Sequence, residues 1–149
     1  AYKSNIGLLL FGDVGTGKSF FAGCIANALL DQDVPVLMTN FPTILNRLTG
    51  MFSEDRSEFI ASFDEYDLLI IDDLGTEYTG NMTASQFFSL LNERHLRQKS
   101  TIISTNLSLE DIRNRYSDRV FSRLTNQYTI CKFTGPDIRM LKKRLQNRK

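Results

Sequence analysis

The sequence predicts an α/β fold in which helices cover a parallel sheet on both faces. An apolar run at 6–11 leads through a glycine-rich stretch into a helical pattern at 18–30, and a second apolar run at 68–71 ends in two acidic residues. Apolar strand-like segments also alternate with helical ones along the whole chain. This alternation predicts βαβ units with right-handed crossovers, and here it predicts a doubly wound sheet of five parallel strands.

The composition fits one α/β domain. The 149 residues are 42% apolar and 23% charged, which is enough for one core and too little for two ordinary domains. We therefore expect residues 1–149 to form a single domain, and because the sequence begins with Ala1 rather than Met, we expect it to be the C-terminal part of a longer protein. No apolar run approaches the roughly 18–20 residues that span a bilayer, so we expect a cytoplasmic protein without a membrane partner.

The glycine-rich stretch Gly12–Ser19 matches G-x-x-x-x-G-K-[ST], the phosphate-binding loop, between a strand and a helix as that motif requires. Its glycines let the backbone turn so that N–H groups aim at an anion, and the helix N-terminus adds its positive dipole. Lys18 would reach the β- and γ-phosphates of a nucleotide, and the Ser19 hydroxyl would ligate Mg²⁺. The residues predicted to bind the nucleotide are Gly12, Asp13, Val14, Gly15, Thr16, Gly17, Lys18, Ser19 and Phe20.

The elements after the loop follow from local patterns. Apolar side chains recur at helical spacing over 18–30, and the apolar segment 35–39 is typical of a buried strand. Asn40 can cap a helix that has Pro42 in its first turn and runs to Gly50. A short helical pattern follows around 59–63.

Asp72 and Asp73 follow the apolar run 68–71 directly. A fully apolar run is typical of a strand that is buried on both faces of a parallel sheet, and ligands of such sheets bind beyond the carboxyl ends of the strands. Two adjacent carboxylates at this point are costly unless they serve a cation. With the phosphate loop upstream, we therefore predict a magnesium site at this strand end rather than a chance surface turn.

The second half of the chain repeats the alternation. The longest helical pattern, 82–98, has Thr83 as a possible cap, and the strand-like segment 101–105 leads into Asn106, a third polar residue at a strand end. Ser108 is a candidate cap for the next helix. The patterns predict strands at 6–11, 35–39, 68–71, 101–105 and 127–133, and helices at 18–30, 40–50, 59–63, 82–98, 108–115, 117–124 and from 135 onwards.

Four segments in this order, GDVGTGKS, LLIIDDLG, TIISTN and SDRVFSRL, resemble the AAA+ ATPases. Within them, the chain is similar to the DnaC/DnaI-type bacterial helicase loaders and the related IstB transposition ATPases, over nearly its whole length. In that family the first two segments are the Walker A and Walker B motifs, the third is sensor 1, and the fourth carries an arginine finger. The resemblance implies an AAA+ core that binds ATP and Mg²⁺ and hydrolyses ATP.

The resemblance also implies a role for each matching residue. Asp73 stands where many members have Glu, the residue that polarises the attacking water, and its shorter side chain predicts slow hydrolysis that suits a switch. Asn106 would orient that water or sense the γ-phosphate. Arg123 would enter the site of a neighbouring subunit when the protein self-associates, with Arg119 as the second candidate finger. The implied metal ligands are Ser19, which binds Mg²⁺ directly, and Asp72, which holds it directly or through water. The implied catalytic set is Lys18, Asp72, Asp73, Asn106 and Arg123.

Two departures from the family limit what carries over. Few residues follow the last predicted strand, so the helical lid is expected to be absent or reduced to one helix, and Arg139 is a candidate replacement for its sensor 2 arginine. No module that could grip a helicase precedes Ile6. Recruiting that partner would need the part of the protein that is missing.

The charge distribution is uneven. Residues 139–149 hold six of the 18 basic residues and no acidic ones, which leaves 12 basic against 17 acidic residues in the rest of the chain. The basic terminal helix or tail at 136–149 could contact a phosphate backbone, or it could be only solubilising. Arg47 and Arg56 are further candidates for DNA contact.

Three functions remain open. The first is a replication ATPase that loads a replicative helicase onto single-stranded DNA. The second is an IstB-like transposition helper, which is the same ATPase attached to a transposase on double-stranded DNA. The third is a nucleotide-regulated interaction module with little hydrolysis. A small-molecule kinase is disfavoured by the Asp-Asp pair, the strand that ends at Asn106 and the SDRVFSRL helix.

Overall fold

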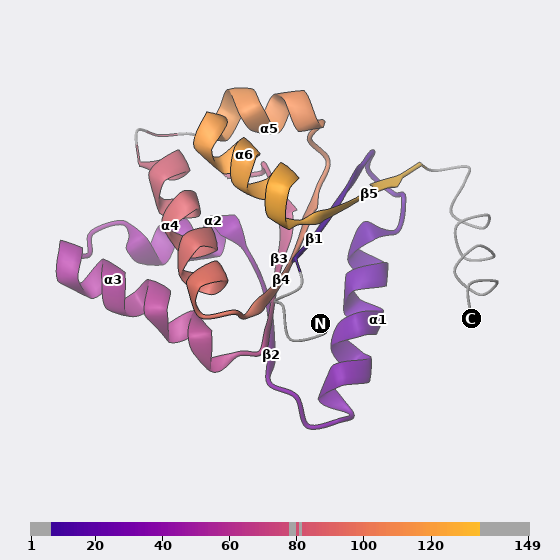
Figure 1. Ribbon diagram of the computed structural model, residues 1–149, viewed down its shortest axis with the longest axis horizontal. Coiled ribbons are helices and arrows are strands. Elements are labelled where there is room, and N and C mark those ends of the chain that lie inside the picture. The colour runs from indigo at the N-terminus through magenta and orange to yellow at the C-terminus, as the bar shows by residue number, and fades with distance from the viewer. Residues whose placement is uncertain (1–6, 78–79, 81, 135–149) are drawn as a thin grey trace.

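Five parallel strands form the centre of the fold in the computed structural model, which describes residues 7–77, 80 and 82–134. The spatial order of the strands is β2-β3-β4-β1-β5, so the predicted five-stranded parallel sheet is confirmed (Figure 1). The strands are β1 (Gly7–Gly12), β2 (Val36–Asn40), β3 (Leu68–Leu74), β4 (Ser100–Thr105) and β5 (Thr129–Phe133).

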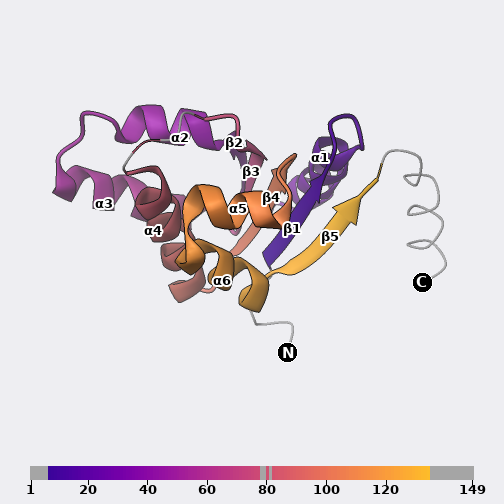
Figure 2. The ribbon, with the colours of Figure 1, turned by 90° about the horizontal axis from the view of Figure 1, so that it is seen from above.

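Helices pack on both faces of this sheet, as Figure 1 and Figure 2 show. Helix α1 lies on one face, and α2 to α6 lie on the other. Among the described residues, no helix is both long and apolar enough to cross a membrane. The helices are α1 (Lys18–Leu30), α2 (Phe41–Leu48), α3 (Ser53–Ser62), the 3₁₀ turn η1 (Phe63–Glu65), α4 (Thr83–Leu96), α5 (Leu109–Tyr116) and α6 (Asp118–Gln127).

Strand β3 is buried on both faces, as its unbroken apolar run predicts. Leu68 and Ile70 belong to the core on the α1 side, whereas Leu69 and Ile71 belong to the core on the α4 side. Successive side chains of a strand point to opposite faces, so a strand between two helical layers needs apolar residues at every position. The double-sided core fixes β3 in the sheet and thereby positions its carboxyl end.

Two of the three predicted helix caps are present. The Asn40 side chain accepts a hydrogen bond from the Thr43 N–H at 2.9 Å, and Ser108 forms a capping box with Asp111. The cap predicted at Thr83 is wrong, because α4 has Met82 at that position, and the Thr83 hydroxyl instead accepts a hydrogen bond from the Gly80 N–H at 2.8 Å.

Several strand and helix ends differ from the predictions. Strand β3 extends to Leu74, so Asp72 and Asp73 lie within its last residues rather than after it. The interstrand pairing continues past the apolar run, which the sequence pattern alone does not reveal. The expected terminal helix with Arg139, the basic stretch 136–149 and the predicted strand position Ile6 lie outside the described residues.

A buried arginine connects α4 to η1 and to the start of β4. Arg94 is 1% exposed, and its guanidinium donates hydrogen bonds to the carbonyl oxygens of Phe63 and Tyr66, at 2.7 Å each, and of Ser100. Burial lowers the pKa of Arg94, although an arginine in a protein keeps its charge. The side chain thus satisfies carbonyls at both ends of η1 and at the start of β4.

Replacing Arg94 by Met should lower the free energy of unfolding by about 3 kcal/mol or more, because several buried carbonyl oxygens lose their charged donor. Arg97 lies three residues further along, and its side chain is 66% exposed beside Asp64 and Glu93. The control Arg97→Met should cost less than about 1 kcal/mol. Urea denaturation followed by circular dichroism measures both values, and equal losses would contradict a special role for Arg94.

Candidate functional site

The phosphate loop Gly12–Ser19 connects β1 to α1 and lines a cleft of about 380 Å³. Gly15 and Gly17 have φ angles of 80° and 92°, values that residues with a side chain rarely adopt. The Thr16 hydroxyl closes the turn by donating to the Asp13 carbonyl at 2.8 Å. The residues lining the cleft are Val14, Gly15, Thr16, Gly17, Lys18, Ser19, Phe20, Asp73 and Asn106.

Lys18 is held inside the loop. Its ammonium group donates hydrogen bonds to the carbonyl oxygens of Gly12 and Asp13, both at 2.8 Å, and to the Thr16 hydroxyl at 3.1 Å. Burial lowers the pKa of Lys18, and the nearby carboxylates, Asp73 first among them, oppose that shift. The loop therefore places a desolvated positive charge at the base of the cleft, where an anion would gain most from it.

Asp72 connects the loop to the sheet. Its Oδ1 accepts hydrogen bonds from the hydroxyls of Ser19, at 2.7 Å, and Ser104, at 2.5 Å. The hydroxyl of Ser19 and the carboxylate of Asp72 are hard oxygen donors that lie together beside the phosphate loop. This donor set fits Mg²⁺, which proteins bind through one or two such groups together with substrate phosphates.

Ser104 is a functional residue that sequence reasoning missed. It is fully buried on β4, donates to Asp72 and accepts a hydrogen bond from the Asp73 N–H at 3.0 Å. It also lies two residues before Asn106, which follows β4 directly, so the two-residue period of a strand could have placed both side chains toward one face of the sheet. Only the pairing of β4 with β3 brings that face against the acidic strand end.

The backbone changes direction at Asp73. The register between β3 and β4 shifts between Ile71 and Leu74, and Asp73 has a φ of 54°. A bulge of this kind re-aims side chains at the end of a strand, and a strained non-glycine residue persists only where its surroundings hold it. As a result the exposed Asp73 faces the cleft together with Asn106, which follows β4 directly.

Two exposed apolar side chains lie at the cleft, and β5 contacts the start of the loop. Val14 and Phe20 are 81% and 65% exposed beside the loop, where they could pack on the base or sugar of a nucleotide. At Gly12, whose φ is 150°, an added Cβ would lie 1.9 Å from the carbonyl oxygen of Phe133. The last residue of β5 therefore touches the start of the phosphate loop.

The two candidate arginine fingers lie elsewhere, on α6. Arg123 donates to Asn92 at 2.8 Å and to Gln127 at 3.2 Å. The guanidinium carbons of Arg119 and Arg123 lie 4.1 and 5.3 Å from the centroid of the Phe88 ring on α4. Neither arginine lines the cleft of its own chain.

The described part of the chain shows no ion pair between Asp118 and either of these arginines. Asp118 forms its ion pair with Arg113, at 3.6 Å. The Phe88 ring attracts both guanidinium groups through cation–π contacts, and Arg123 also donates to two side chains of its own chain. Both candidate fingers therefore lie on α6, apart from the phosphate loop of the same chain.

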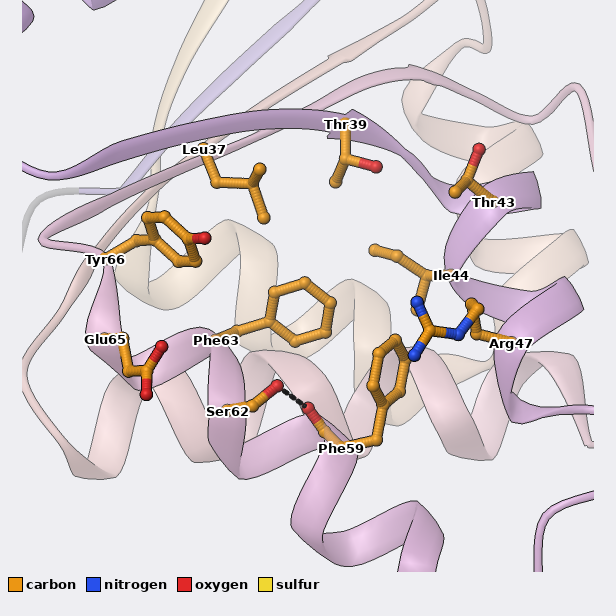
Figure 3. Close-up of a pocket in the computed structure, with 10 residues that line it drawn as sticks. All are labelled: Leu37, Thr39, Thr43, Ile44, Arg47, Phe59, Ser62, Phe63, Glu65 and Tyr66. Carbon is orange, nitrogen blue, oxygen red and sulfur yellow. Dashed lines mark hydrogen bonds between the residues drawn. The ribbon is translucent and has the colours of Figure 1, made fainter.

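A second cavity, of about 330 Å³, lies between β2, α2, α3 and η1 (Figure 3). Phe63 and Leu37 line its interior, and Arg47 lies at its rim with its guanidinium carbon 4.9 Å from the centre of the Phe59 ring. Arg56 is engaged differently, because it donates to the Met51 carbonyl at 2.6 Å. Of the two candidate DNA contacts on α2 and α3, Arg47 is the one that lines this cavity.

Comparison with known proteins agrees with this geometry. The family model described as "IstB-like ATP binding protein" matches residues 2–146. Over 100 residues the chain is 36% identical to an insertion sequence ATP-binding protein of Sinorhizobium fredii, a match that covers 66% of this chain and 33% of that protein. It is 26% identical over 124 residues to the chromosomal replication initiator DnaA of Acholeplasma laidlawii, covering 80% of this chain and 27% of DnaA.

The fold is also shared with solved structures. The DnaC helicase loader superposes with a TM-score of 0.75 at 22% identity, over 89% of this chain and 81% of that one. The chain spans only about a quarter to a third of the length of the two curated relatives above. The predicted AAA+ core fold is thus confirmed, and the chain belongs to the IstB-like ATP-binding protein family, with sequence similarity to the replication initiator DnaA.

Proposed function

We propose that the chain binds ATP with Mg²⁺ in the cleft and hydrolyses it to ADP and phosphate. The observation that carries this proposal is the shared Oδ1 of Asp72, which accepts hydrogen bonds from Ser19 on the loop and from Ser104 on β4. Ser19 and Asp72 would hold Mg²⁺, which when bound would offset the charge of the phosphates. Lys18 exchanges its loop carbonyls for the β- and γ-phosphate oxygens.

Asp73 and Asn106 act on the attacking water. Both line the cleft beside Lys18, and the bulge in β3 exposes the Asp73 carboxylate. Asp73 accepts a hydrogen bond from the water and Asn106 holds it in line with the γ-phosphate. Because Asp is one methylene shorter than Glu, we expect slow turnover, which suits a nucleotide-dependent switch.

Arg123 completes the site of a neighbouring subunit. It lies outside the cleft of its own chain, ordered by Asn92 and the ring of Phe88. A guanidinium brought to the γ-phosphate offsets the negative charge that develops during transfer. ATP would then favour self-association, because each bound γ-phosphate gains a partner arginine.

We further propose that residues 1–149 are the AAA+ module of a longer cytoplasmic protein that loads a replicative helicase onto single-stranded DNA. The similarity in fold to the DnaC helicase loader supports this role. Arg47 at the rim of the cavity beside α2, together with the basic residues of 136–149, would supply the electrostatic part of DNA binding.

The second candidate is a transposition helper that acts with a transposase on duplex DNA. The match to the IstB-like family and the 36% identity to an insertion sequence protein favour it. Binding of ATP-loaded protein to labelled single-stranded and duplex DNA at several salt concentrations separates the two roles. Preference for single strands supports helicase loading, and preference for duplex supports transposition.

Substituting Lys18 by Ala should abolish nucleotide binding, because the cleft loses its buried cation. Lys99 offers a matched control, since its ammonium lies 3.1 Å from the Asp67 carboxylate at the surface, away from the cleft. Lys99→Ala should bind a fluorescent ATP analogue like the wild type. Equal affinity of the Lys18 variant and the wild type would contradict the proposed site.

Replacing Ser104 by Ala should lower the ATPase rate about tenfold and raise the Mg²⁺ concentration needed for half-maximal rate, because Asp72 and the Asp73 N–H lose their common partner. Ser85→Ala is the control, since Ser85 is exposed on α4 and donates to the Met82 carbonyl of its own helix start. Steady-state rates across a Mg²⁺ titration test this expectation. An unchanged titration curve for the Ser104 variant would argue against it.

Arg123→Ala should reduce turnover about 10³-fold even at high protein concentration, because the finger acts between subunits. Mixing it with the Lys18→Ala variant should restore part of the activity, since an intact phosphate loop can then meet an intact arginine. Arg113→Ala, which removes the ion pair with Asp118, serves as control. Absence of complementation together with wild-type-like turnover of Arg123→Ala would eliminate the intersubunit finger.

A further inference from the structure

Glu77 is a buried acid that the proposed mechanism does not use. The residue is 5% exposed, and its carboxylate accepts hydrogen bonds from the Gly75 N–H, at 2.9 Å, and from the Tyr116 hydroxyl. The Arg115 guanidinium adds an ion pair at 3.5 Å and also donates to the Glu77 carbonyl. Burying a carboxylate is costly unless hydrogen-bond donors replace its water molecules. The donors around Glu77 supply this compensation.

Glu77 and its partners Gly75, Arg115 and Tyr116 form a cluster that is connected to the cleft through Gly75. Gly75 lies two residues after Asp73, and at its φ of 108° an added Cβ would lie 2.9 Å from the side chain of Leu107. The Thr105 hydroxyl donates to the Leu74 carbonyl at 2.6 Å. The end of β3 and the turn after it therefore pack against the end of β4 and the loop after it, and these two segments carry Asp73 and Asn106.

The other end is fixed to α5. Tyr116 is the last residue of α5 and is fully buried, with its ring centroid 5.2 Å from that of Phe87 on α4. Burial, and then the nearby Glu77, raise the pKa of the Tyr116 hydroxyl, so it remains a proton donor. Its hydrogen bond to Glu77 joins the turn after β3 to the C-terminus of this helix.

Ser117, the next residue, is the joint between α5 and α6. Ser117 has a φ of 121°, and its hydroxyl accepts a hydrogen bond from the Val120 N–H at 3.3 Å at the start of α6. A single residue in a strained conformation leaves little freedom between the two helices. A displacement of Tyr116 is thus passed to α6, which carries Arg119 and Arg123.

We propose that Glu77 is a positioning residue that couples the nucleotide cleft to the arginines of α6 through its hydrogen bond to Tyr116. The inference rests on the proposed function and deepens it. It names the contacts through which the nucleotide cleft of one subunit would control the position of the arginines that this subunit presents to its neighbour. When a nucleotide shifts Asp73 and the following turn, Glu77 moves Tyr116 and the α5–α6 joint with it. Glu77 itself touches no reacting atom.

The test records ¹⁹F NMR spectra of the full chain labelled with 3-fluorotyrosine, with and without Mg²⁺ and a non-hydrolysable ATP analogue. The chain has five tyrosines, and the Tyr116→Phe variant assigns the signal of Tyr116. We expect that signal to shift on nucleotide binding although Tyr116 does not line the cleft. We expect the shift to be lost in Glu77→Gln while the analogue still binds.

A kinetic readout accompanies the spectra. Glu77→Gln and Tyr116→Phe should each lower the Arg123-dependent ATPase rate about tenfold without weakening nucleotide binding, and the double variant should lose no more than either single one. Tyr116→Phe keeps the ring and its packing, so it remains informative if Glu77→Gln does not fold. Ile112→Val, which trims a buried side chain of α5 outside the cluster, should leave the rate per folded molecule unchanged.

The outcomes separate the inference from the proposed function. A Tyr116 signal that stays in place at saturating nucleotide, or full Arg123-dependent activity in both variants, overturns the coupling and leaves the ATPase intact. A wild-type chain that binds no nucleotide overturns the proposed function and the inference with it. A rate loss in Ile112→Val equal to that of Tyr116→Phe would reduce Glu77 to an ordinary packing role and also overturn the coupling.

Discussion

The hydrogen bonds that Asp72 accepts from Ser19 and Ser104 are the contact on which the rest of the site depends. They join the phosphate loop after β1 to the ends of β3 and β4, three segments far apart in the sequence. Parallel strands deliver their carboxyl ends to one edge of the sheet, so each segment needs only a suitable residue at its end. The double-sided core of β3 supplies the rigidity, because no side chain of its apolar run can shift without disturbing a helix layer.

Much of the fold was predictable because its determinants are local. The phosphate loop needs specific residues at fixed spacing, and the strand 68–71 needs apolar residues at every position. Both can therefore be recognised without knowing the rest of the structure. The helix α1 and the cap at Asn40 were predicted for the same reason. Strand order and register depend on which segments meet, and the sequence pattern does not encode that directly.

The residues whose roles were not predicted depend on contacts between segments that are far apart in the sequence. Ser104 is one hydroxyl among several in the sequence TIISTN until β3 pairs with β4. Glu77 has the sequence appearance of a surface turn residue, yet a helix 39 residues further along buries it. Arg94 likewise resembles a solvated helical arginine, and only the carbonyls of η1 and β4 make it a core residue. The roles of Asn106 and Arg123 in hydrolysis stay predictions.

The contact between Gly12 and Phe133 connects the edge strand β5 to the phosphate loop. The carbonyl oxygen of Phe133 lies 1.9 Å from where a Cβ at Gly12 would be, so any side chain at this position would push apart the carboxyl ends of β1 and β5. Gly12 is also the last residue of β1, and Lys18 donates a hydrogen bond to its carbonyl oxygen. A disturbance at the edge of the sheet would therefore displace the buried cation of the loop.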